Sequence, residues 1–401
     1  MNRFICIIAF VFLALPVWPS RKISVSELED MLKSMEAEKK SDAEIATTLK
    51  QLELSEELTR EAMYHLTDNV PGRLTLEQIY VLEARSAFLP PPPADIPSTP
   101  APDVAAQKAL LDKAAGYVAN SYSQLPALTA TKTTLRFQDS VEAVASSTGV
   151  KGSAKDTTVE SSFSDPYLFI HYINATVHPV AIEAGSEKKP AEKDPTLWGA
   201  NGYIKILEPE PNLSEVFRLA QLSGSFQWVR WESIAGRSMA VFSFSVPKQK
   251  DGLKIDVCCF PKRTEAGVAN FYTASTGRAV GGSEATPGVG GVTGNWQTTM
   301  DWNNFKTVAP YHGELFIDPG KGIVVRMNVE AEMKPTDAVL QLDTRIDYGA
   351  VTAGTNTYVV PVRSIIDSVD IPGGVSGAAA YSRRTTLFTS EYADYRPEQT
   401  K

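Results

Sequence analysis

Histidines paired with carboxylates could carry acid–base or metal chemistry, and the chain has only four histidines. His171 and His178 lie seven positions apart, which suits no common ligand pair, and His65 falls at the end of an expected helix. His312 and Glu314 lie two positions apart in an expected strand, so both side chains would project from one face. That pair is the best candidate for an ion. Because no third ligand is visible, we predict no metal and no cofactor.

The signatures of common enzyme classes are absent from the sequence. It contains no G-x-S-x-G elbow, no H-E-x-x-H pair, no phosphate-binding G-x-x-x-x-G-K-[ST] loop and no kinase motif. The glycine-rich stretch 277–294 lacks the lysine and the following helix of a phosphate cradle, so we expect a surface loop there. A non-enzymatic protein is therefore favoured, and a hydrolase of unknown specificity remains an alternative.

Two neighbouring cysteines, Cys258 and Cys259, are the only ones beyond the first twenty residues. Adjacent residues in a strand point to opposite faces, which favours one buried and one outward thiol. A disulfide between the two neighbours and a bridge to another molecule stay open. In each case the pair cannot close a stabilising loop of the chain.

The N-terminus has the pattern of an export signal. Arg3 places a positive charge before an apolar run from Phe4 to Trp18, and about fifteen residues is the length of a signal-peptide core. We therefore expect residues 1–20 to be a signal peptide, with removal of about 18–22 residues and a periplasmic or secreted protein. A buried N-terminal strand or helix is the alternative.

Composition limits the partners of the remaining chain. No later apolar run approaches the ~18 residues of a membrane span, so we do not expect an integral membrane protein. The formal net charge of −8 argues against nucleic acid and anionic lipid headgroups as partners. A hydrophobic fraction of 43% is sufficient for a packed core.

Helical signals fill residues 21–89. Capping boxes begin at Ser24, Ser41 and Thr75, and apolar residues follow each of them at helical spacing, which predicts small helical hairpins. Seven prolines between Pro90 and Pro102 then predict a semi-rigid linker over residues 90–102. Asp103 is positioned to cap a long helix.

From Thr129 onward the period of the hydrophobic pattern changes from 3.6 to 2. The clearest hairpin runs from Tyr311 to Asp318, turns through residues 319–322 and returns to Val329. We expect its alternate polar residues to face water; these are Arg326, Asn328, Glu330 and Glu332. The predicted fold class is α+β, in which residues 103–395 form a long helix packed on a curved antiparallel sheet of half-barrel type.

Several segments carry a family resemblance. They are Tyr311–Arg326, Thr344–Val351, Tyr358–Ser364, Ser86–Pro90 and Leu135–Asp139. Together they resemble uncharacterised exported proteins that are abundant in acidobacterial soil bacteria. The C-terminal part is similar to the half-open β-barrels of the periplasmic lipoprotein-carrier superfamily. That resemblance implies a concave apolar sheet face able to hold an acyl chain, although the helical region and the proline linker depart from the superfamily.

Strand alternation places an apolar patch on the sheet. Leu315, Ile317, Val325 and Met327 are expected to share one face of the hairpin, and Phe242 and Phe244 to extend it from another strand. The patch is either the core of a closed sandwich or a slot for an acyl chain under the helix at 103–124 and the short helix after Asn212.

The main functional hypothesis is an exported non-enzymatic binding protein for an apolar or amphipathic ligand, a lipid or a lipoprotein acyl chain. The alternative is an envelope scaffold or protein-interaction module that binds another envelope protein through its helical hairpins.

Overall fold

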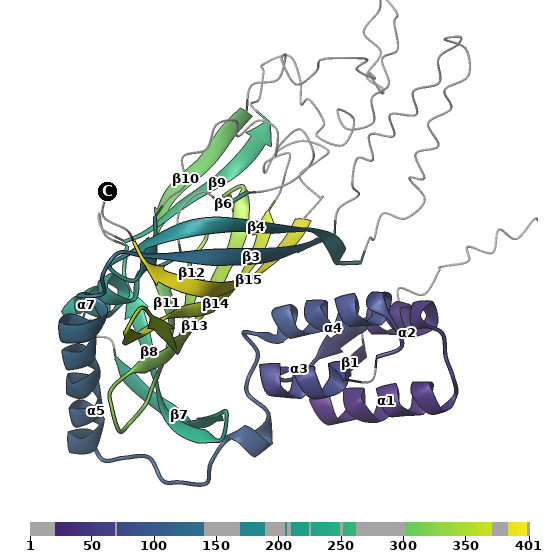
Figure 1. Ribbon diagram of the computed structural model, residues 1–401, viewed down its shortest axis with the longest axis horizontal. Coiled ribbons are helices and arrows are strands. Elements are labelled where there is room, and N and C mark those ends of the chain that lie inside the picture. Colours follow the sequence, from purple (N-terminus) through teal and green to yellow (C-terminus); the bar gives the residue numbers. More distant parts are fainter. Residues whose placement is uncertain are drawn as a thin grey trace, which may run out of the picture.

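The computed structural model describes residues 21–68, 70–139, 169–188, 205–206, 210–223, 226–248, 252–261, 302–370 and 384–398. Across these residues the fold is α+β, with helices first and strands afterwards, as the sequence predicts (Figure 1). The expected signal peptide, the glycine-rich stretch 277–294 and the side chains of Cys258 and Cys259 lie outside the described part of the chain.

The helical region contains β1 (Arg21–Ile23), α1 (Val25–Ala37), α2 (Asp42–Leu49), β2 (Leu52–Leu54), α3 (Arg60–Thr67) and α4 (Arg73–Ser86). The capping boxes at Ser24 and Ser41 are confirmed. The capping box predicted at Thr75 was wrong. The helix α4 begins before Thr75, and the Asp42 carboxylate accepts hydrogen bonds from the Leu74 and Thr75 amides. The short strands β1 and β2 form a parallel pair that the sequence did not indicate.

The proline-rich segment connects this region to a long helix. It contains the short 3₁₀ turn η1 (Pro93–Asp95) and ends at Asp103, whose carboxylate accepts a hydrogen bond from the Ala106 amide. The helix α5 (Val104–Tyr117) follows and continues into the π-helical turn η2 (Val118–Tyr122). The indole of Trp231 donates to the Pro100 carbonyl oxygen, which ties the linker to the sheet.

The main sheet has ten strands in the order β5-β4-β3-β15-β14-β13-β12-β11-β8-β7. In chain order these are β3 (Leu128–Gln138), β4 (His171–Glu183), β5 (Ser186–Glu187), β7 (Gln227–Ile234), β8 (Arg237–Val246), β11 (Tyr311–Ile317), β12 (Val324–Ala331), β13 (Val339–Ala353), β14 (Asn356–Asp370) and β15 (Arg384–Pro397). All neighbours pair antiparallel. Half-barrel curvature stays a prediction.

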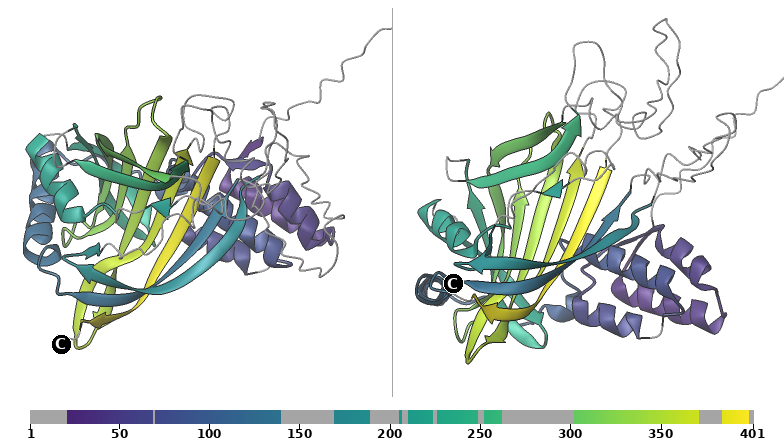
Figure 2. Two further views of the ribbon diagram at one scale, coloured as in Figure 1. Left: turned by 90° about the horizontal axis from the view of Figure 1, so that it is seen from above. Right: turned by 45° about the horizontal axis from the view of Figure 1, so that its top comes forward.

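One face of this sheet, the apolar face, is covered by α5 and by α7 (Leu213–Ser223), as Figures 1 and 2 show. Phe242, Leu315 and Met327 are fully buried there against Ala114 of α5 and Phe217 of α7. Asn212 caps α7, because its side-chain oxygen accepts a hydrogen bond from the Glu215 amide. This layer is the largest hydrophobic core among the described residues.

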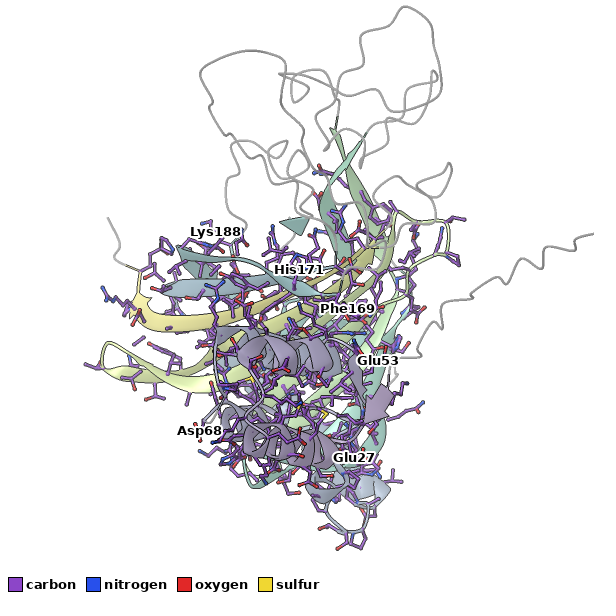
Figure 3. All side chains as sticks on the ribbon, turned by 90° about the vertical axis from the view of Figure 1, so that its right-hand side faces the viewer. Glu27, Glu53, Asp68, Phe169, His171 and Lys188 are labelled. Atoms are coloured by element: carbon purple, nitrogen blue, oxygen red, sulfur yellow. The ribbon has the colours of Figure 1, made fainter. Side chains whose placement is uncertain are left out.

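The opposite face carries charged side chains and is covered by the helical region. Val81 and Ala84 of α4 pack against Ile365 and Leu387 of this face. Seen from the helical side, Glu27, Glu53 and Asp68 lie in front of the sheet (Figure 3). We call this surface the charged face, because Arg230, Arg326, Arg345, Asp347 and Arg363 project from it.

A smaller sheet packs at the end of the main one. It contains β6 (Lys205–Ile206), β9 (Leu253–Pro261) and β10 (Trp302–Ala309), in the order β10-β9-β6. Ile255 and Val257 of β9 contact Val339 and Leu342 of the main sheet. Within the described ranges, no helix is both long and apolar enough to cross a bilayer.

The expected solvent exposure of the hairpin's polar residues was partly wrong. Arg326 and Asn328 are buried on the charged face, with 8% and 7% of their surface exposed, while Glu332 is exposed. The helical region covers the part of the face that holds the first two. Alternation in the strand gives the face of each residue, but the packing of a distant segment decides whether that face meets water.

Candidate functional site

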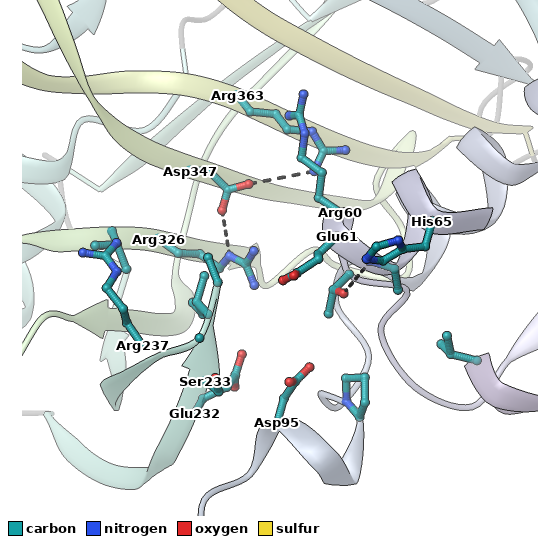
Figure 4. A pocket seen from close by; sticks show the side chains of 18 of the residues that line it. Arg60, Glu61, His65, Asp95, Glu232, Ser233, Arg237, Arg326, Asp347 and Arg363 are labelled. Atoms are coloured by element: carbon teal, nitrogen blue, oxygen red, sulfur yellow. Dashed lines mark hydrogen bonds and ion pairs between the residues drawn. The ribbon is translucent and has the colours of Figure 1, made fainter. Parts of the chain in front are cut away.

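A cavity of about 1220 Å³ lies between the helical region and the charged face. Its walls are the start of α1, the segment from Glu56 to His65, the turn η1, the β7–β8 turn and parts of β12, β13, β14 and β15. Segments separated by more than 300 positions in the sequence thus line one space (Figure 4). We take this cavity as the candidate functional site, because concave sites between packed units are common ligand positions.

A buried carboxylate, Glu57, holds two arginines of the charged face beside the cavity. Its Oε1 accepts from Arg345 Nη1 at 2.5 Å and from Arg326 Nη1 at 3.2 Å, and its Oε2 accepts from Arg345 Nη2 at 3.2 Å. Only 4% of Glu57 is exposed. Glu57 lies just before α3 in the helical region, whereas Arg326 and Arg345 lie on strands of the main sheet. These ion pairs therefore join the two regions directly.

Asp347 and Glu83 complete this ion network. Asp347 accepts from Arg326 Nε at 2.7 Å, and Glu83 of α4 accepts from Arg363 Nη2 at 2.5 Å. Burial raises the pKa of Asp347, but the three arginines Arg326, Arg345 and Arg363 outweigh it and hold that pKa below its usual value. Burial raises the pKa of Glu83 in spite of Arg363. Removing one member would leave buried charge without a partner, which is strongly destabilising.

Two carboxylates on the helical side, Glu61 and Asp95, face the cavity without such pairing. Figure 4 shows both directed into the space between the helical region and the strands. Among the described residues, neither has an ion-pair or hydrogen-bond partner. Partial burial raises the pKa of Asp95, and the negative charges of Glu57, Glu61 and Glu56 raise it further. Carboxylates therefore crowd this wall of the cavity.

On the sheet side, the guanidinium of Arg230 forms ion pairs with two carboxylates. Arg230 donates to Glu232 at 2.8 Å and, through two nitrogens, to Glu314 at 2.8 and 3.0 Å. Burial raises the pKa of Glu232, an effect that Arg230 only partly offsets. Glu232 and Ser233 lie on the cavity wall across from Asp95 (Figure 4).

Cationic groups on the wall are mostly occupied by neighbours within the chain. Arg60 donates to Glu391 at 2.6 Å and to the Tyr64 hydroxyl at 2.7 Å. Arg237 is mostly exposed and lies 3.7 Å from Asp318. Aliphatic and aromatic residues also line the cavity; they are Val25, Ile234, Val325, Val362, Tyr348 and Tyr392. The wall therefore suits a ligand that combines charge with apolar stems.

The residues predicted to line an acyl slot do not form one surface. Phe242, Phe244, Leu315, Ile317 and Met327 share the apolar face and are at most 2% exposed beneath α5 and α7. The placement of Val325 with them was wrong. The register shifts after Phe316, so that Ile317 pairs with Val324, and this β-bulge turns Val325 toward Met239 and Val241 on the other face.

The two members of the best ion candidate in the sequence have different partners in the structure. His312 lies 3.6 Å from Glu330 and 3.5 Å from Glu332, whereas Glu314 is bound by Arg230. Over the described residues, no group of three or more His, Cys, Asp or Glu side chains is arranged to hold a metal ion.

Sequence reasoning missed the ion network, although two signals for it were present. Arg345 and Asp347 lie two positions apart on β13 and so share a face, and Arg363 of β14 pairs in register with Asp347. Opposite charges side by side on one face of neighbouring strands are typical of ion pairs. Glu83 interrupts an apolar stretch of α4, between Leu82 and Ala84. A charge within an apolar helix face indicates a buried partner.

Comparison with known proteins adds no family assignment. No protein-family model matches the chain, and no curated protein shows significant sequence similarity to it.

Proposed function

We propose that this protein is an exported, non-enzymatic binding protein whose ligand occupies the cavity between the helical region and the charged face. The observation that carries the proposal is the cavity itself, at about 1220 Å³. Sites for drug-sized molecules enclose about 300–1,000 Å³, so this space suits a longer ligand of several residues or units. Export is supported by the charged start and apolar run of residues 1–18.

The apolar face supports the lipid hypothesis less well. An acyl chain there would have to displace α5 and α7, whose residues Ala114, Leu213 and Phe217 are fully packed against the strands. Displacing them would expose apolar surface at about 25 cal/mol per Å² before any ligand is bound. The cavity, in contrast, is open without any rearrangement of the core.

The test uses thermal unfolding with a panel of fatty acids, oligosaccharides and short peptides. A ligand at one hundred times its dissociation constant stabilises the folded state by about 2.7 kcal/mol, which raises the melting temperature measurably. We compare Ala94→Trp, which fills the cavity from η1, with Ala105→Trp on α5, since both alanines are exposed and only the first lines the cavity.

We expect ligands from the panel to stabilise the wild type and Ala105→Trp but not Ala94→Trp. A fatty acid that stabilised all three proteins equally would indicate that the ligand binds at the apolar face and not in the cavity. A panel without any stabilising member would favour the scaffold hypothesis, in which the helical region binds another envelope protein.

A further inference from the structure

We propose that the ligand of this cavity is cationic, with ammonium or guanidinium groups on aliphatic stems that are bound by Glu61 and Asp95. This inference rests on the proposed binding function and names the chemistry of its ligand. A lysine-rich or arginine-rich peptide segment and a polyamine both have that chemistry.

The first argument is the charge left over on the cavity walls. The guanidinium groups of Arg326, Arg345 and Arg363 are matched by Glu57, Asp347 and Glu83, so this network supplies no free cation for an anionic ligand. Arg60 is matched in the same way by Glu391. The paired groups therefore contribute little net charge to the cavity.

The unmatched charge is negative. Within the described part of the chain, Glu56, Glu61 and Asp95 have no cationic partner, and Glu56 only accepts a hydrogen bond from the Val25 amide. On the other wall, Glu232 shares Arg230 with Glu314. A cation between the walls would meet carboxylates on both sides. Glu56 and Asp95 are partly buried, which strengthens such an interaction relative to bulk water, while Glu61 is exposed.

The next argument is that the backbone holds Glu61 and Asp95 at defined places on the cavity wall. Asp95 is fixed on the 3₁₀ turn η1, and Glu61 lies in the first turn of α3, so both carboxylates are carried by short rigid elements. On the strands that form the opposite wall, Ile234, Val325 and Val362 line the same cavity and can contact the methylene stems of lysine or arginine. The size of the cavity admits an extended ligand with more than one cationic group.

The experiment measures binding by calorimetry to the full chain with tetralysine amide, spermine and tetraglutamate. The test variant is Glu61→Gln/Asp95→Asn. The control is Asp30→Asn/Glu38→Gln, which changes net charge equally at two exposed residues of the helical region outside the cavity lining. Folding of each variant is checked by its melting temperature.

We expect at least one basic ligand to bind the wild type and the control, with affinity about tenfold lower in the test variant. Higher ionic strength should weaken this binding, because exposed charges are screened. Tetralysine binding without spermine binding assigns the site to peptides, and equal binding of both assigns it to the amines themselves.

Tighter binding of tetraglutamate, or equal loss in test and control variants, would overturn the inference. Suppose that ligands of the thermal-unfolding panel stabilised the wild type but not Ala94→Trp, while neither basic ligand bound. The cavity would then remain the binding site, and only the inference of a cationic ligand would be wrong. If basic ligands bound Ala94→Trp as well as wild type, the cavity itself would not be their site.

Discussion

At the scale of single residues, two glycines occupy the same left-handed backbone conformation in different surroundings. Gly185 has φ of 78° and Gly236 has φ of 72°. A Cβ on Gly185 would lie 2.3 Å from the ring of Tyr122, whose hydroxyl donates to the Gly185 carbonyl at 2.6 Å. A Cβ on Gly236 would meet no atom within 4 Å. A comparison of Gly185 with Gly236 therefore separates the energetic cost of backbone strain from the cost of overpacking.

We predict that Gly185→Ala lowers the free energy of unfolding by about 2–4 kcal/mol and Gly236→Ala by about 1 kcal/mol. Both alanines must adopt a positive φ, which costs about 1–2 kcal/mol, but only the first also overpacks a buried aromatic ring. Urea denaturation of the two variants and the wild type measures the difference. Equal losses would mean that Tyr122 moves away without cost.

At the scale of elements, three neighbouring strands bring carboxylates together on one face. Asp343 of β13 pairs in register with Glu330 of β12 and with Asp367 of β14. Burial raises the pKa of Asp343 to about 7; the charges of Glu330 and Asp367 add to this, and the hydrogen bond from Gln341 opposes it. Burial likewise raises the pKa of Asp367 to about 6.

The raised pKa of Asp343 predicts a pH-dependent stability. Its folded pKa of about 7 lies above the unfolded value, so the folded state holds an extra proton between about pH 4 and pH 7. The resulting stabilisation is complete below about pH 4 and is lost as the pH rises through 7. We therefore expect Asp343→Asn to be more stable than wild type at about pH 8, by on the order of 2 kcal/mol.

That advantage should disappear at about pH 4, where the wild-type carboxyl is protonated and resembles the amide. Denaturant unfolding at the two pH values measures it, and Asp30→Asn on α1 controls for the change in net charge. A constant difference between Asp343→Asn and wild type at both pH values would contradict the raised pKa.

At the scale of the whole molecule, buried charge holds the helical region on the sheet. Glu57 and Glu83 are at most 4% exposed and bind arginines of β12, β13 and β14 across the interface. The linker of residues 90–102 would allow separation by about 40 Å if the contacts were lost, at ~3.1 Å per residue for extended proline-rich chain. The cavity exists only while this docking holds.

We predict that Glu57→Gln/Glu83→Gln releases the helical region. Removing one partner of a buried pair costs about 3–5 kcal/mol because the remaining charge is left without compensation. Small-angle X-ray scattering should show a larger radius of gyration, and proteolysis within residues 90–102 should accelerate. Glu391→Gln is the control, because its pair with Arg60 is partly exposed and contributes at most about 1 kcal/mol. An unchanged radius would mean that apolar packing by α4 suffices.

Much of the fold follows from local patterns. The boxes at Ser24 and Ser41 and the cap at Asp103 depend on residues within a few positions of each other, and the hairpin from Tyr311 depends on two adjacent strands joined by a short turn, so the sequence alone identifies them. The boundary of α4 was missed because Asp42, more than thirty positions away, supplies its cap. Val325 was misplaced because a β-bulge changes the face of a residue without a clear sequence mark.

By itself, the sequence determined the class of the longer helices and strands, the α+β order and many of the apolar residues that became the core, since these depend on periodicity and local hydrogen bonds. The sequence also placed α5 and α7 over the apolar face, but only the tertiary structure decided that they bury it as a packed core and that the helical region lies on the charged face. Burial of Glu57, Arg326 and Arg345 depends on contacts over more than 260 positions. Local sequence patterns do not report such distant pairing, and the cavity arises where it brings the two regions together.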